Sequence, residues 1–156
     1  MSTVRAAHLL IKHTGSRNPV SRRTNETITL TPEAAMEELK EYEAKIIAEG
    51  VDTAFPKYAE ERSDCSSFKN KGDLGDFGRG DMQKAFEDAA FALQPDQMSG
   101  IVSTDSGYHL IYGIAWGYSA MQRRIAVATA VSNLPLHTIG VMQDWATEYF
   151  SKKIRA

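Results

Sequence analysis

The sequence predicts an α+β domain in which helices pack around a sheet. The order of segments supports this class: a strand-like segment comes first, three helix-like segments follow with a short glycine-rich strand among them, and a hairpin-like segment comes last. The chain of 156 residues has the usual size of one globular domain, and a chain of this size can bury a substantial core.

The first strand is expected over residues 4–13, which have β-type apolar content. Its period-two alternation predicts one face that carries chemistry and one that carries core. The first face holds His8, Leu10 and Lys12, and the second holds Ala7, Leu9 and Ile11. Residues 14–25 are polar and contain Gly15 and Pro19, so we expect an exposed loop, which is also the most basic stretch of the chain.

Two helices are expected next. Thr31 supplies an N-cap and Pro32 suits the first helical position, and apolar residues then recur at helical spacing as far as Gly50. A shorter helix is expected over residues 53–60. Residues 62–67 indicate a turn or the start of a strand rather than a helix.

The second half of the domain begins with a glycine-rich segment at residues 72–80, where glycines permit positive φ and close approach of the backbone. Its spacing is not that of a dinucleotide-binding motif. A helix is expected over residues 83–93, and Thr104–Gly107 has the composition of a hairpin loop between two strands. The second of these strands should place His109 and Ile111 on one face, opposite Tyr108, Leu110 and Tyr112.

Charge and cysteine content exclude several classes of function. A formal net charge of −2 provides no overall basic field, so binding of nucleic acid is not indicated. The single cysteine, Cys65, excludes an intrachain disulfide and a zinc cluster built from cysteines, and we expect neither a metal nor a cofactor. The N-terminal residues lack the pattern of a secretory signal, which predicts an intracellular protein.

His8, Cys65 and His109 are the candidate reactive residues. A histidine in a strand is usually a hydrogen-bonded, half-buried residue, and a lone cysteine is usually a small buried apolar one. Cysteine and histidine together can also serve nucleophilic hydrolysis. The local signatures of cysteine proteases are absent, however, and no Asn or Asp stands in a recognisable orienting motif.

Two further groups allow both an ordinary and a functional interpretation. The basic residues Lys12, Arg17, Arg22 and Arg23 would ordinarily form a solvated loop, but several cations together can also bind a phosphate. Met82 and Phe86 have helical spacing and would usually belong to the core, but they can also form the wall of an apolar pocket.

Eight segments carry a resemblance to a known family, and they occur in that family's order: His8–His13, Gly15–Arg17, Ser63–Ser67, Gly72–Gly75, Gly78–Gly80, Met82–Lys84, Phe86–Ala89 and Thr104–His109. The chain resembles the parvulin prolyl isomerases, specifically the phospho-directed Pin subgroup. The resemblance implies a parvulin (FKBP-like) architecture, a four-stranded antiparallel sheet surrounded by about four helices. It further implies an isomerase domain over residues 1–115 and a C-terminal extension over residues 116–156.

The resemblance also assigns roles to individual residues. It implies a catalytic group of His8, Cys65, Ser106 and His109, with Thr104 as a neighbouring hydroxyl. It implies a pocket for the substrate proline made of Leu74, Met82, Gln83 and Phe86. It implies phosphate binding by Lys12 and Arg17, with Arg22 and Arg23 available if the loop folds back. The sequence departs from the family pattern in two ways. Asn18 occupies the place where phospho-directed members commonly have a second arginine, and the sequence lacks the WW module that some relatives carry in front of this domain.

The resemblance implies a peptidyl-prolyl cis/trans isomerase that acts on phosphoserine-proline or phosphothreonine-proline bonds without covalent chemistry. Its expected partners are phosphorylated Ser/Thr-Pro protein segments, and its expected location is the cytoplasm and nucleus. Two alternatives remain open: a parvulin chaperone isomerase without phosphate preference, and a catalytically idle phosphopeptide-binding module.

The C-terminal extension contains an uncharged stretch over residues 125–142, preceded by two arginines, which superficially resembles a tail anchor. Polar residues such as Asn133 and Pro135 within it argue against a membrane span. Val141, Trp145 and Tyr149 follow helical spacing, so we expect an amphipathic segment that docks on the domain or on a partner.

Overall fold

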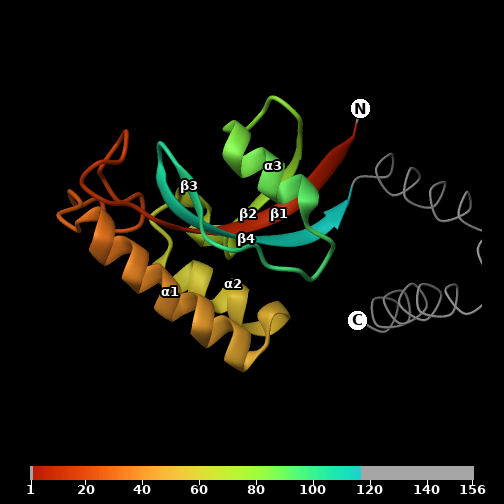
Figure 1. Cartoon of the computed structure of the whole chain (residues 1–156), viewed down its shortest axis with the longest axis horizontal. Coiled ribbons are helices and arrows are strands. Elements are labelled where there is room, and N and C mark those ends of the chain that lie inside the picture. Colours follow the sequence, from red (N-terminus) through yellow and green to blue (C-terminus); the bar gives the residue numbers. More distant parts are fainter. Residues whose placement is uncertain (1, 117–156) are drawn as a thin grey trace, which may run out of the picture. The chain divides into compact units, whose positions relative to one another are not determined.

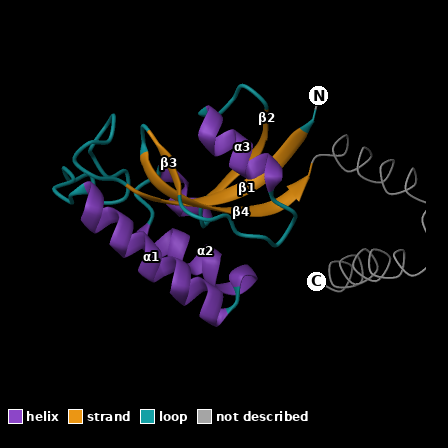
Figure 2. Ribbon diagram, viewed as in Figure 1, coloured by secondary structure: helices purple, strands orange, loops and turns teal. Residues whose placement is uncertain are grey.

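The computed structural model describes residues 2–116, and the predicted features of the C-terminal extension lie outside these residues. The elements follow in the order β1 (Thr3–Ile11), α1 (Pro32–Glu49), α2 (Val51–Arg62), the 3-10 helix η1 (Ser66–Asn70), β2 (Asp73–Gly78), α3 (Lys84–Ala92), β3 (Val102–Thr104) and β4 (Gly107–Trp116). The four strands form one antiparallel sheet in the order β2-β1-β4-β3 (Figure 2). This arrangement confirms the predicted fold class, with three α-helices and one short 3-10 helix in the described part of the chain.

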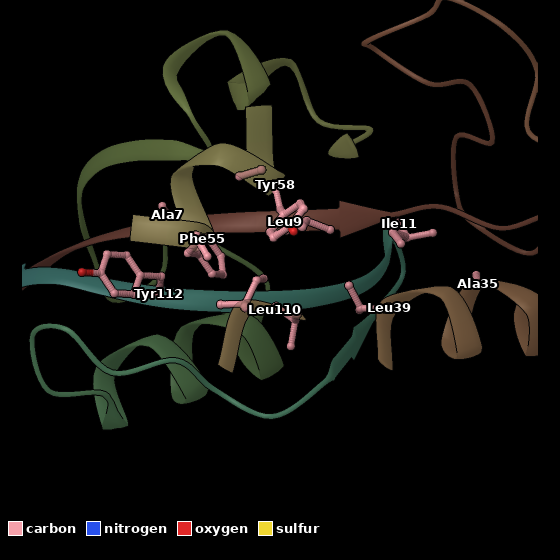
Figure 3. Close-up of a cluster of buried hydrophobic side chains, with 12 residues drawn as sticks. Ala7, Leu9, Ile11, Ala35, Leu39, Phe55, Tyr58, Leu110 and Tyr112 are labelled. Atoms are coloured by element: carbon pink, nitrogen blue, oxygen red, sulfur yellow. The ribbon is translucent and has the colours of Figure 1, made fainter. Parts of the chain in front are cut away.

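The helices cover both faces of the sheet. Helices α1 and α2 lie on one face and α3 lies on the other (Figure 1). The first face carries the larger apolar cluster, in which Leu9, Phe55 and Leu110 are fully buried (Figure 3). The second cluster packs β1, β2 and β4 against α3 and includes Val4, Phe77, Phe86 and Ile111.

The alternation predicted for the two central strands is confirmed. Ala7, Leu9 and Ile11 belong to the cluster under α1 and α2, as do Leu110 and Tyr112 of β4. The opposite face is not polar throughout, because Val4 and Ala6 belong to the α3 cluster. The site therefore occupies only one end of that face.

A single glycine separates the first two helices. Thr31 Oγ1 accepts a hydrogen bond from the Ala34 amide at 3.2 Å, as expected of an N-cap, and Pro32 is the first helical residue. Gly50, with φ of 101°, ends α1 and directly precedes α2. Helix α2 therefore begins at Val51, two residues before the predicted start, and ends at Arg62.

The segment predicted to be a turn or strand start is helical at both ends, because Arg62 is the last residue of α2 and a 3-10 helix begins at Ser66. The prediction is therefore wrong for Arg62, Ser66 and Ser67. The helix is made by local bonds, with the Phe68 amide donating to Cys65 O and the Lys71 amide donating to Phe68 O, each at 3.0 Å. A turn of this length has no apolar repeat that a sequence pattern could reveal.

Gly72 fixes the position of η1 against β1. Its amide donates to Ser67 O and its carbonyl accepts from the His8 amide, each at 2.9 Å. Its φ is +84°, and a Cβ placed on it would lie 2.5 Å from the His8 carbonyl oxygen and 2.9 Å from Ala59 Cβ. Only glycine therefore fits at this crossing of the backbone.

We expect Gly72→Ala to lower the free energy of unfolding by about 3 kcal/mol or more, because it combines backbone strain with a backbone clash. Gly75→Ala is the matched control, because Gly75 has a similar φ of +72° but open space around its Cβ position. The control should cost only about 1–2 kcal/mol. Urea unfolding of both variants measures the difference, and equal losses would contradict the close approach at Gly72.

Candidate active site

Two histidines meet on the face of the sheet that α3 covers. In the β1–β4 pairing, His8 is opposite Ile111 and Leu10 is opposite His109, which places both imidazoles on the same face. His8 Nδ1 and His109 Nδ1 lie 3.0 Å apart and the ring planes differ by 19°. Both side chains are buried, with exposed fractions of 5% and 4%.

A hydroxyl lies at each outer end of this pair. Ser67 Oγ, in η1, is 3.2 Å from His8 Nε2, and Thr104 Oγ1, in β3, is 2.7 Å from His109 Nε2. When both imidazoles are neutral, two proton arrangements satisfy the four groups: either Thr104 donates and the protons point toward Ser67, or Ser67 donates and they point toward Thr104. The tautomers of the two imidazoles are therefore coupled.

His109 is neutral over the physiological pH range. Burial, and then the charge of His8, lower the pKa of His109 to about 3. A neutral imidazole carries one N–H and one acceptor nitrogen, which is the state that the chain of hydrogen bonds requires.

Cys65 directly precedes η1 and is half-buried beside the imidazoles. Burial raises the pKa of its thiol, but the interactions with the His8 ring and with Ser67 outweigh burial and bring the pKa down to about 6. At neutral pH the sulfur is therefore largely a thiolate.

An apolar pocket of about 190 Å³ opens beside these groups. The structure brings together here all the residues predicted for the catalytic group and the proline pocket: His8, Cys65, Leu74, Met82, Gln83, Phe86, Thr104, Ser106 and His109. The Phe86 ring packs edge-on against both imidazoles, at centroid distances of 5.5 Å from His8 and 5.2 Å from His109. The pocket thus has an aromatic wall next to its polar groups.

Gln83 connects the start of α3 to the hairpin loop. Its Nε2 donates to Ser106 Oγ at 3.0 Å, and its Oε1 accepts from the Asp105 amide at 3.1 Å. The Asp105 carbonyl in turn accepts from the Arg17 amide at 2.7 Å. Gln83 therefore holds the loop that separates the apolar pocket from the basic segment.

A second, polar pocket of about 230 Å³ adjoins the first, and the two share Cys65 and Ser106. The residues lining it are Leu10, Lys12, Arg17, Asn18, Arg22, Cys65, Ser66 and Ser106. Three of the four predicted phosphate-binding cations therefore meet in one place.

Arg23, the fourth cation, does not line this pocket. The pKa of Tyr42 in α1 is raised, chiefly by burial, and the charge of Arg23 opposes that rise. The charge of Arg23 thus acts on a residue of α1, whereas its side chain does not line the polar pocket.

Lys12 holds the basic loop in addition to lining the pocket. Its Nζ donates to Asn18 O at 2.9 Å and to Val20 O at 2.7 Å. Burial, and then the charge of Arg22, lower the pKa of Lys12. The ammonium thus contributes positive charge while two of its three protons are used by the loop.

Sequence reasoning missed Asp64, which supports the polar pocket from behind. This carboxylate is 1% exposed and accepts from the Lys12 amide at 3.0 Å and from Ser21 Oγ at 2.7 Å, and it pairs with Arg62 at 3.2 Å. Asp64 stands beside Cys65 in a segment that resembles the family, but its partners are distant in sequence and no local pattern names them.

Residues 2–116 contain no group of three or more His, Cys, Asp or Glu side chains that could hold a metal ion. Within the same range, none of the helices has the length and apolar character needed to cross a bilayer.

Comparison with known proteins identifies the family. The family model described as "Rotamase: PPIC-type PPIASE domain" matches residues 8–115. The chain therefore belongs to the PPIC-type, or parvulin, family of peptidyl-prolyl cis/trans isomerases. Within that family it is an isomerase of the Pin1/ESS1 kind.

Several curated isomerases and solved structures are similar to this chain over most of its length. The chain is 50% identical over 116 residues to "Peptidyl-prolyl cis-trans isomerase NIMA-interacting 1" of Theileria annulata, which is 74% of this chain and 82% of that protein. It is 49% identical over 111 residues to "Peptidyl-prolyl cis-trans isomerase Pin1" of Arabidopsis thaliana, covering 69% and 92% of the two chains. The solved structure of ESS1 from Candida albicans matches with a TM-score of 0.68 and 37% identity, over 72% of this chain and 63% of that one.

We expect the rate of Cys65 alkylation by iodoacetamide to rise with pH through a midpoint near pH 6, since the thiolate is the reactive form. His8→Asn should move this midpoint upward, because the His8 interactions are lost while burial still raises the thiol pKa. Cys65 is the only cysteine, so alkylation followed by mass spectrometry reports it alone. The urea-unfolded chain provides the control, with a midpoint at about pH 8.5, and the same value in the folded protein would contradict the assignment.

Proposed function

We propose that this protein isomerises prolyl bonds that follow phosphoserine or phosphothreonine. The observation that carries the proposal is the shared boundary of the two pockets, which have Cys65 and Ser106 in common. A prolyl ring in the apolar pocket and a phosphate on the preceding residue in the cationic pocket would place the intervening amide at that boundary. The proposed partners are phosphorylated Ser/Thr-Pro segments of proteins.

The charge pairing of the arginines supports an anion site. Arg5, Arg62 and Arg79 each pair with a carboxylate, at distances of 2.6, 2.5 and 3.2 Å. Arg17 and Arg22 are exposed and have no such partner among residues 2–116. Two free guanidinium groups that line one pocket suit a phosphate, which accepts several charge-assisted hydrogen bonds. Arg22 would supply the second guanidinium of the site, since Asn18 occupies the place of the second arginine.

The proposed mechanism follows from what amide rotation requires. The planar amide is stabilised by resonance, and the barrier to rotation is about 18–20 kcal/mol. Holding the ring and the phosphate at two anchors confines rotation to the bond between them. Every 1.36 kcal/mol by which the site prefers the twisted amide gives about a tenfold increase in rate.

The groups beside the amide would favour the twisted form without forming a bond to it. In the planar form resonance places partial negative charge on the carbonyl oxygen, and a thiolate at Cys65 next to that oxygen would oppose this charge. The neutral His109, joined to His8 and Thr104, keeps the polar wall in a fixed arrangement. Isomerisation needs no covalent adduct, so we assign Cys65 a non-covalent role.

One comparison tests the proposal against its two alternatives. Isomerisation rates are measured by exchange NMR on a pair of peptides that differ only in phosphorylation of the serine before proline. Phospho-directed catalysis requires a much higher kcat/KM for the phosphopeptide. Equal rates would instead favour the chaperone type of isomerase, and binding of the phosphopeptide without turnover would favour an idle binding module.

We expect Arg17→Ala and Arg22→Ala each to lower kcat/KM for the phosphopeptide by about tenfold, which is about 1.4 kcal/mol of lost charge-assisted hydrogen bonding. Turnover of the unphosphorylated peptide should be unchanged. Arg23→Ala is the matched control, because Arg23 lies in the same loop but does not line the pocket. Equal losses on both peptides, or a loss in Arg23→Ala as large as in the other two, would contradict the assignment.

Met82→Ala should affect the phosphorylated and the unphosphorylated peptide equally. Met82 lines only the apolar pocket, so its truncation should lower kcat/KM by a similar factor for both peptides. The same NMR assay measures both rates, with urea unfolding to show that each variant is folded. A loss confined to the phosphopeptide would be inconsistent with a proline-binding pocket at this position.

A further inference from the structure

We propose that Ser21 is a positioning residue for the anion pocket, acting through the buried carboxylate of Asp64. This inference rests on the proposed function, since it concerns how the cationic loop is presented to a phosphate. Ser21 is only 1% exposed and lines neither pocket, so it would act without touching substrate.

Ser21 is one of the points at which the basic loop is fixed to the rest of the domain. Its hydroxyl donates to Asp64 Oδ1 at 2.7 Å and accepts from the Arg23 and Thr24 amides at 3.2 and 3.4 Å. Its own amide donates to Glu26 O, and its carbonyl accepts from the Asn25 amide. One side chain thus closes the turn and joins it to a carboxylate.

The next residue shows why this connection matters for the pocket. The Arg22 amide donates to the Asp64 carbonyl at 2.9 Å, so Asp64 holds both Ser21 and Arg22. Cys65, at the boundary of the two pockets, is the next residue after Asp64. The position of the Arg22 backbone relative to Cys65 is therefore set through Asp64 and Ser21.

Asp64 is itself held in place by contacts with two other parts of the domain. Arg62 pairs with it at 3.2 Å, and the Lys12 amide donates to its second oxygen at 3.0 Å. Arg62 in turn pairs with Glu38 of α1, so the carboxylate is held from the helical layer behind it. A carboxylate fixed in this way can orient the loop while the charges of Arg17 and Arg22 remain available.

Removing the Ser21 hydroxyl should loosen the loop and leave the apolar pocket intact. We expect Ser21→Ala to lower kcat/KM for the phosphopeptide by about tenfold, through a higher KM rather than a lower kcat. The unphosphorylated peptide should be turned over at the wild-type rate. Ser21→Thr, which keeps a hydroxyl, should restore most of the difference.

Thr24→Ala is the matched control, because Thr24 lies in the same loop and, within residues 2–116, its hydroxyl accepts only from the Glu26 amide. It should keep the wild-type ratio of the two kcat/KM values. A wild-type ratio in Ser21→Ala would overturn the inference. So would equal losses on both peptides, since a general loss of structure has that effect.

A second measurement separates this inference from the proposed function. Inorganic phosphate is titrated into wild-type protein and Ser21→Ala, and the amide NMR shifts of residues 15–23 report binding. If wild-type protein shows no peptide preference but binds phosphate more tightly than Ser21→Ala, the proposed function fails and the role of Ser21 stands. Equal affinities in the two proteins, or no binding to wild-type protein, would overturn the inference.

Discussion

The antiparallel register between β1 and β4 is the constraint on which the rest of the site depends. It places Leu10 opposite His109 and His8 opposite Ile111, so both imidazoles reach the face that α3 covers. A shift by one residue would turn His109 to the side of α1 and α2 and Leu110 to the side of the site. The β1–β4 register therefore determines both which side chains enter the larger apolar cluster and which face carries the two histidines, and a shift in register would disrupt both.

The elements around this pair each add one group that the strands cannot supply. The 3-10 helix brings Ser67 to one imidazole, the hairpin brings Thr104 to the other, and α3 brings Phe86 across both. The basic loop is fixed differently, through the carboxylate of Asp64 and the ammonium of Lys12. An apolar pocket built on regular elements thus adjoins a cationic pocket built on a loop, and Cys65 lies where the two meet.

The sequence allowed much of this to be predicted, and the exceptions have physical causes. Period-two alternation identified the faces of β1 and β4, because strand pleating is local, and the motifs indicated the family. The 3-10 helix at Ser66 could not be predicted, since so short a turn has no apolar repeat. The sequence could not show which of Arg22 and Arg23 lines the polar pocket. That choice depends on the contact between Ser21 and Asp64, which are 43 positions apart in the sequence, so no local pattern encodes it.

The separation of the two central strands along the chain has a consequence for biosynthesis. His8 and His109 are 101 positions apart, and both apolar clusters need residues of β4. At about 5–20 residues per second, translation would leave β1 waiting about 5–20 s for its neighbour in the sheet. During that interval Leu9 and Ile11 have no β4 to cover them. The nascent chain therefore exposes an apolar strand to chaperones until nearly the whole domain has left the ribosome.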